Sequence, residues 1–126
     1  MRRILSIDID PRSTVPPYEQ IRAGVATRAA DGSLPAGTRL PTVRDLATRL
    51  GVAANTVAKA YRELEHAGLV ETRGRHGTFV TARAAGVSRE AQQLAARYAT
   101  DSRDLGVDPR QALALVRAAL GLDPQD

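Results

Sequence analysis

Several kinds of residue are absent or scarce in this chain of 126 residues. There is no cysteine and no tryptophan, and aromatic residues make up only 3% of the sequence. Without cysteine the chain has no disulfide framework, no thiolate metal site and no cysteine nucleophile. His66 and His76 are the only histidines, and no acidic residue stands at a recognisable ligand spacing, so we expect no metal and no cofactor. Because no nucleophile is paired with a base, we do not expect an enzyme.

Long apolar runs are absent as well. No stretch of about 18 apolar residues occurs, so the sequence predicts no membrane span. The first ten residues are basic, but Asp8 and Asp10 interrupt their short apolar part, which argues against a signal peptide. We therefore expect a cytoplasmic protein. The length leaves room for one domain and a modest appendage, but not for two independent cores.

Positive charge is plentiful and unevenly distributed. The formal net charge is +4, which favours a polyanionic partner. Residues 1–85 contain 13 basic and 8 acidic residues, a charge of +5, whereas residues 86–126 contain 5 and 6, a charge of −1. The positive field therefore belongs to the first part of the chain.

Two short amphipathic helices joined by a glycine turn are predicted between Leu40 and Thr81. Thr42 followed by Asp45 is a capping pattern for the first helix, and Gly51 ends it. Apolar residues recur at helical spacing in both helices: Val43, Leu46, Ala47 and Leu50, then Val57, Ala60, Tyr61 and Leu64. This order is typical of a helix-turn-helix.

The second of these helices is predicted to have a polar, cationic side. At 100° per residue, Asn55, Lys59, Arg62 and His66 share the side opposite the apolar positions. Such a stripe on an exposed helix is what reading the DNA major groove requires. Arg44, at the second position of the first helix, is placed to meet a phosphate. The alternatives are a helix cap for Asn55 and ordinary surface charge for the basic residues.

A hairpin is predicted after the second helix. The segments LVETR and TFVT flank a loop at residues 74–77, which is rich in glycine. Arg73, Arg75 and His76 lie near its tip and are expected to form a wing that reaches the DNA backbone or minor groove. The alternative is a solvated turn. The fold class predicted is mainly α with a small β wing: a winged helix-turn-helix followed by a two-helix tail.

Further elements are predicted on either side. Ile4, Ile7 and Ile9 alternate as in a short strand, and a helix is expected from Pro17 to about residue 30. We expect the DNA-binding domain to occupy residues 1–83, and a helical dimerisation region residues 87–122.

The two tail helices are too short to bury their apolar sides alone. They must pack on the first domain or on a second copy of the chain, and we favour the second copy. The residues expected at this homodimer interface are Leu94, Tyr98, Leu105, Leu113, Val116 and Leu120.

The motifs together resemble the winged-helix domain of GntR-type bacterial transcription regulators. The matching pieces are YEQI at 18–21, LPAG at 34–37, LPTVR at 40–44, NTV at 55–57, YREL at 61–64 and GTFV at 77–80. The resemblance covers about residues 4–82. The short tail is similar to that of the YtrA subfamily, which lacks a large ligand-binding domain and dimerises through these helices.

The resemblance implies a sequence-specific regulator, more specifically a repressor, that binds a two-fold operator in double-stranded DNA. The contacts that it implies come from Arg44, Asn55, Thr56, Lys59, Arg75, His76 and Gly77. One departure is Ala53-Ala54, where the family often has Ser or Thr followed by Arg. It implies either a different operator or a greater dependence on Lys59 and the wing. Two alternatives stay open: a regulator with a small-molecule effector between the tail helices, and a winged helix that binds proteins.

Overall fold

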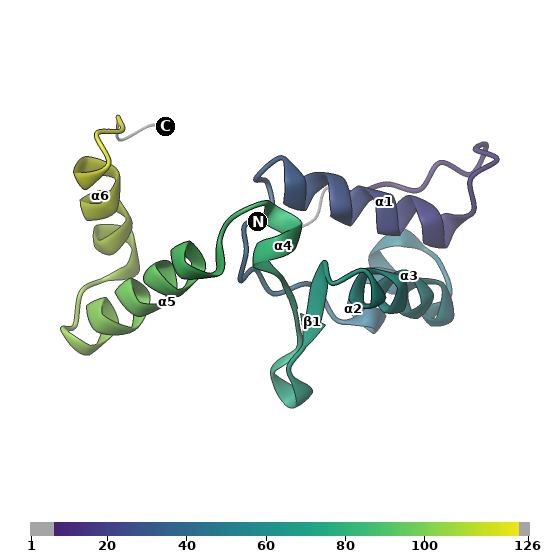
Figure 1. Ribbon diagram of the computed structural model, residues 1–126. Helices are drawn as coiled ribbons and strands as arrows, with labels where there is room; N and C mark the ends of the chain where they lie inside the picture. The colour runs from purple at the N-terminus through teal and green to yellow at the C-terminus, as the bar shows by residue number, and fades with distance from the viewer. Residues whose placement is uncertain (1–6, 124–126) are drawn as a thin grey trace. The chain divides into compact units, whose positions relative to one another are not determined.

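The computed structural model describes residues 7–123. Its elements are α1 (Pro17–Ala30), α2 (Val43–Leu50), α3 (Ala54–His66), β1 (Val70–Thr72), the 3₁₀ turn η1 (Gly74–His76), β2 (Thr78–Val80), α4 (Ala82–Ala85), α5 (Arg89–Asp104) and α6 (Pro109–Ala119) (Figure 1). The chain divides into two compact units between Arg89 and Glu90. A mainly helical chain with a small antiparallel wing is the fold class that the sequence predicts, and this prediction is confirmed. No helix within residues 7–123 is both long and apolar enough to cross a membrane.

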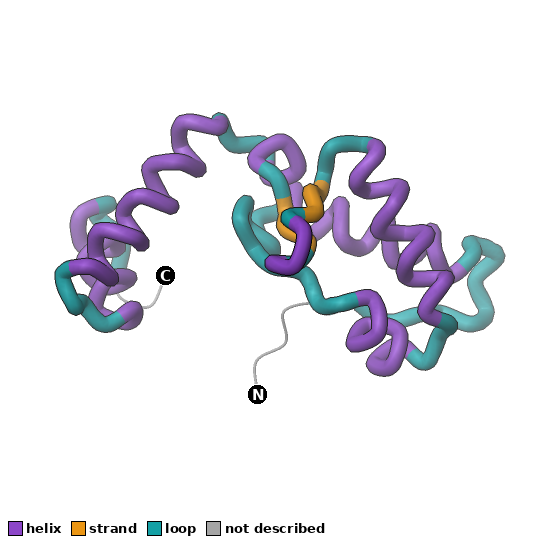
Figure 2. The backbone as a smooth tube through the Cα atoms, turned by 90° about the horizontal axis from the view of Figure 1, so that it is seen from below, coloured by secondary structure: helices purple, strands orange, loops and turns teal. Residues whose placement is uncertain are grey.

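A single hydrophobic core holds the first unit together. Both α1 and α2 pack against α3, and the two strands pair beside them (Figure 2). The largest fully buried side chains come from the three helices, from β2 and from the loop before α2: Ile21, Val25, Leu34, Leu46, Val57, Leu64 and Val80. Burying a side chain of this size contributes about 1.5–3 kcal/mol, so the core fixes α3 firmly in place.

The ends of α2 agree with the prediction, whereas the start of α3 shows something new. The Thr42 hydroxyl accepts a hydrogen bond of 3.1 Å from the Asp45 N–H, and Gly51 ends the helix in the left-handed region at φ 68°. In α3 the capping position is Ala53, which provides no side-chain hydrogen bond. Asn55 already lies inside the helix, so the alternative that it caps α3 is wrong.

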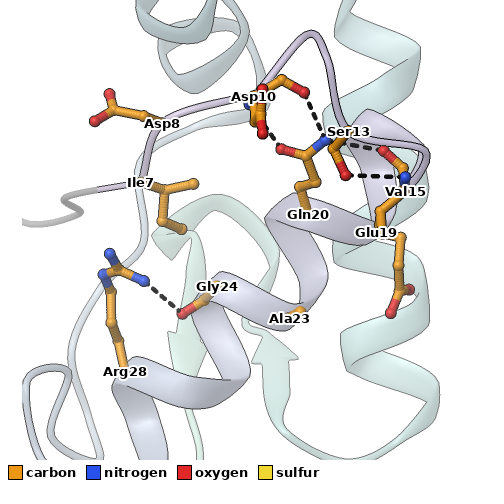
Figure 3. A pocket seen from close by; sticks show the side chains of 10 residues that line it. All are labelled: Ile7, Asp8, Asp10, Ser13, Val15, Glu19, Gln20, Ala23, Gly24 and Arg28. Carbon is orange, nitrogen blue, oxygen red and sulfur yellow. Dashed lines mark hydrogen bonds between the residues drawn. The ribbon is translucent and has the colours of Figure 1, made fainter.

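The predicted strand near the N-terminus does not form in the described residues. Ile4 lies outside them, and residues 7–10 are extended without a strand partner. Their polar backbone groups use a side chain instead: Gln20 of α1 accepts from the Asp10 N–H at 2.8 Å and donates to the carbonyl oxygens of Asp10 and Val15. Ile7 is buried close to Gly24, as Figure 3 shows. The pattern of Ile7 and Ile9 therefore marks two contacts with the core, one buried and one half-buried, and not a sheet edge.

Two further features of the first unit were not predicted. The segment 38–40 runs beside β2, with the Leu40 N–H bonded to the Thr78 carbonyl at 2.8 Å and the Val80 N–H bonded to the Thr38 carbonyl at 2.9 Å. After the wing, residues 82–85 form α4, and the Thr81 hydroxyl accepts from the Ala84 N–H and donates to the Gly68 carbonyl. The first pair of bonds attaches β2 to the segment before α2. The Thr81 bonds close the base of the wing and cap α4.

The second unit is a pair of helices with little buried surface. The Tyr98 hydroxyl of α5 donates to the Ala112 carbonyl of α6 at 2.8 Å, and the Asp108 side chain caps α6 by accepting from the Arg110 N–H. Between Glu90 and Asp123, Ser102 and Ala112 are the only buried residues. Hydrogen bonds and the turn between α5 and α6 therefore fix the arrangement of the two helices more than a hydrophobic core does.

Candidate nucleic-acid interface

The structure separates the two sides of α3 as the sequence predicts. Val57, Ala60, Tyr61 and Leu64 are buried in the core, whereas Asn55, Lys59, Arg62 and His66 are exposed. The Tyr61 hydroxyl donates to the Pro41 carbonyl at 2.8 Å, which ties α3 to the start of α2, and burial raises the pKa of this phenol. The exposed side of α3 is thus held on a rigid, buried support.

The cations of α3, together with Arg44 of α2 and Arg75 of the wing, have no acidic partner among the described residues. Within residues 7–123, no carboxylate forms an ion pair with Arg44, Lys59, Arg62 or Arg75. Arg44 is exposed near the start of α2, and Thr56, on the first turn of α3, is half-buried. The Lys59 ammonium lies 3.9 Å from the centroid of the Tyr18 ring. These positive charges are not neutralised by the protein, so they are free to act on an external anion.

The wing is a hairpin of two three-residue strands with a 3₁₀ turn at its tip. Val70, Glu71 and Thr72 pair with Val80, Phe79 and Thr78. The predicted loop at residues 74–77 is this turn plus Gly77, and the Arg73 N–H closes it by donating to the Gly77 carbonyl at 2.8 Å. Arg75 and His76 are exposed at the tip.

Arg73 has different surroundings from the other two residues of the predicted wing surface. Its guanidinium donates to a Glu71 carboxylate oxygen at 2.8 Å and lies 4.3 Å from the centroid of the Phe79 ring. These contacts hold it along the hairpin, with its charge partly balanced by Glu71. Among the predicted wing residues, Arg75 and His76 are those that the structure leaves without such partners.

Arg39 lies at the base of the wing and was missed in the sequence. It is exposed, and a side chain at Gly77 would place its Cβ 2.8 Å from the Arg39 Nε atom. A hollow of about 210 Å³ lies between Arg39, the start of α2 and the inner side of the hairpin. Local sequence could not indicate this residue, because its position depends on the pairing of segment 38–40 with a strand almost 40 positions later.

A second hollow, of about 490 Å³, lies between residues 7–15 and α1 (Figure 3). Its polar groups are largely used within the protein. Gln20 is bonded to Asp10 and Val15, and the Arg22 side chain lowers the pKa of Glu19 by hydrogen bonding to its carboxylate. The Gln20 bonds fasten residues 10–15 onto α1, whereas the Arg22–Glu19 pair lies within α1.

The tail presents apolar side chains to solvent. Leu94, Leu105, Leu113 and Leu120 are exposed to 71%, 81%, 55% and 69% of their surface. Tyr98 is 37% exposed and is bonded to α6, and Val116 is half-buried. Leu115 and Leu122 are also exposed, and they are not among the predicted interface residues. In a single copy of the chain these apolar side chains are left exposed to solvent.

Comparison with known proteins places this geometry in context. Residues 17–80 match the model of the family described as "Bacterial regulatory proteins, gntR family". The chain is 60% identical over 73 residues to the HTH-type transcriptional regulator Rv1152 of Mycobacterium tuberculosis, covering 58% of this chain and 60% of that protein. It is 45% identical over 75 residues to the HTH-type transcriptional repressor YtrA of Bacillus subtilis, covering 60% and 58%.

A solved structure extends the likeness beyond the matched sequence. YtrA from Sulfolobus acidocaldarius, a GntR-family transcription factor, has a TM-score of 0.58 and 33% identity, covering 79% of this chain and all of that one. The matched segment spans about three fifths of the length of each of the two curated relatives.

Proposed function

The chain belongs to the gntR family of bacterial regulatory proteins and resembles its YtrA members, and from this we propose that it represses transcription as a homodimer bound to a two-fold operator. DNA-binding transcription regulation follows from the family itself. The observation that supports the finer proposal best is the exposed side of α3, whose cations have no carboxylate partner within residues 7–123. The repressor function is supported by the name of the Bacillus subtilis relative.

In this proposal α3 enters the major groove. Asn55 forms paired hydrogen bonds with an adenine edge, and Lys59 donates to guanine acceptors. Thr56 and Arg62 contact the sugar–phosphate backbone beside them, and Arg44 fixes the register on a phosphate. The acidic Glu63 and Glu65 mark the end of the helix that leaves the groove, because phosphate repels carboxylate.

The wing contacts the adjacent backbone. Arg75 and His76 extend to phosphates or into the minor groove. Gly77, which has no side chain, lets Arg39 lie close to the hairpin and reach the same DNA strand. Arg73 stabilises the hairpin and adds charge near it. The hairpin thus adds affinity that depends little on sequence.

The tail joins two such DNA-binding domains. Burying exposed leucines of α5 and α6 against a second copy removes apolar surface from water, at about 25 cal/mol per Å². Two-fold pairing then presents two α3 helices to two half-sites. If six to eight phosphates are neutralised per dimer, log K falls with log salt at a slope of about −5 to −7.

Asn55→Ala tests base reading. We expect a loss of about 1–3 kcal/mol on the matched operator and a much smaller loss on a scrambled site, because an adenine contact contributes only where the adenine is present. The measurement is a salt-titrated shift assay on both DNAs. Thr27→Ala, an exposed change on α1, is the control and should alter neither. Equal losses on the two DNAs would contradict the reading role of Asn55.

Arg39→Ala tests the contact at the base of the wing. We expect affinity to fall on matched and scrambled DNA alike, and the salt slope to become shallower by about 0.9 for each Arg39 that meets a phosphate. Arg110→Ala removes the same charge from an exposed position in the tail and serves as the control. An unchanged slope in Arg39→Ala would show that this guanidinium does not reach the backbone.

A further inference from the structure

An aromatic ring holds the only lysine of the chain. The Nζ atom of Lys59 lies 3.9 Å from the centroid of Tyr18, well inside the distance at which a cation is attracted to a ring face. Tyr18 lies on the first turn of α1, half-buried and packed against the core, whereas Lys59 is exposed on α3. A fixed ring thus contacts a side chain that would otherwise be among the most mobile on the surface.

The carboxylate one helical turn after Lys59 does not pair with it in the described residues. Glu63 is four residues after Lys59, but no ion pair joins them within residues 7–123. The pKa of Arg22 is raised, first by its hydrogen bond to Glu19 and also by the charge of Glu63. Lys59 is therefore left with a neutral neighbour in place of an acidic one.

This difference matters for a group that meets DNA. A carboxylate would orient the ammonium but would also cancel its charge and repel phosphate. A ring face orients the ammonium through its quadrupole and leaves the full positive charge in place. The ring covers one side of the ammonium, and the remaining N–H donors stay available because the residue is exposed.

We propose that Tyr18 is a positioning residue for DNA recognition: its ring holds the Lys59 ammonium in advance at the place where it meets a base edge or phosphate. This inference rests on the proposed function, since Lys59 must contact DNA. Its physical basis is preorganisation, because a side chain already restricted in the free protein loses less freedom on binding. The hydroxyl of Tyr18 has no part in this role.

A double-mutant cycle tests the proposal. Tyr18→Leu, Tyr18→Phe and Lys59→Ala, and each Tyr18 variant combined with Lys59→Ala, are titrated onto the matched operator in the full chain. Tyr18→Leu should weaken binding about two- to fivefold per DNA-binding domain, and Tyr18→Phe, which keeps the ring, should bind like the unchanged chain. With Lys59→Ala already present, Tyr18→Leu should have almost no further effect.

Other results would overturn it. An equal loss for Tyr18→Phe would assign the effect to the hydroxyl, and an equal loss in the Lys59→Ala background would assign it to packing between α1 and α3. Tighter binding by Tyr18→Leu would mean that the ring competes with DNA for the ammonium. Lys59→Ala binding as the unchanged chain does would instead refute the proposed role of Lys59 itself, so the two failures are distinguishable.

A measurement without DNA checks the contact independently. Because the chain has one lysine, lysine labelled with ¹³C gives a single Cε–Hε resonance. The ring should shift this resonance upfield in the unchanged chain and in Tyr18→Phe, and Tyr18→Leu should return it to the position of a free lysine. A resonance at the free position in the unchanged chain would overturn the proposal even if Tyr18→Leu fails to fold.

Discussion

Replacing Leu94 and Leu113 together by Asp should convert the proposed dimer to a monomer and lower affinity for the proposed two-half-site operator about 100-fold or more. Both leucines are largely exposed in the single chain, so the change costs the folded unit little, but a carboxylate at either position would have to be desolvated in the dimer. Once the subunits separate, the second half-site is no longer bound at a high effective concentration, and this gain is commonly 10²–10⁴.

Sedimentation of the free protein and titration of one-half-site and two-half-site DNA measure this effect. Affinity for the single half-site should stay nearly unchanged, because the DNA-binding domain keeps its residues. Ala96→Asp adds one aspartate on the opposite side of α5 from Leu94 and should leave the proposed dimer intact. A double variant that still sediments as a dimer would show that the subunits meet elsewhere.

Leu64→Ala should lower the free energy of unfolding by about 2–5 kcal/mol. Leu64 is only 1% exposed and lies on the buried side of α3, so its truncation removes apolar burial and leaves a cavity in the core. A change of this size is a large part of the total stability of a small domain. Urea unfolding followed by circular dichroism measures it.

The comparison for this prediction is Val15→Ala, where 42% of the valine surface is exposed in the same unit. We expect that change to stay within about 0.5 kcal/mol of the original chain. A loss below 1 kcal/mol for Leu64→Ala would mean that α3 is not held by the core as described. DNA binding by Leu64→Ala should recover when the temperature is lowered enough to keep it folded.

Local pattern was enough to predict the longer helices and the wing, although not the short helix α4. The capping pair Thr42 and Asp45, the glycine at 51 and the alternation of buried and exposed positions in α3 are all set by neighbours within one or two helical turns. For such elements the sequence and the three-dimensional packing agree, since one apolar stripe decides both the period of the helix and the side that is buried.

The features that were missed depend on contacts between distant segments. Residues 7–10 have an alternating pattern, but a strand needs a partner, and the Gln20 side chain takes that place. Arg39 becomes part of the candidate surface only because its segment runs beside β2. The contact of Tyr18 with Lys59 joins α1 to α3, which are separated along the chain by α2, and no local sequence pattern indicates it. None of these could be read from a single stretch of residues.

Gly77 limits how this protein can diverge. Its backbone has φ 110°, a conformation that residues with a side chain rarely adopt, so each substitution there is strained. A side chain at this position would also require the flexible Arg39 side chain to move. The neighbouring tip positions, Arg75 and His76, are exposed and do not have a positive φ. Substitutions at the two tip positions can therefore change what the hairpin contacts, whereas position 77 is restricted to glycine by its backbone conformation.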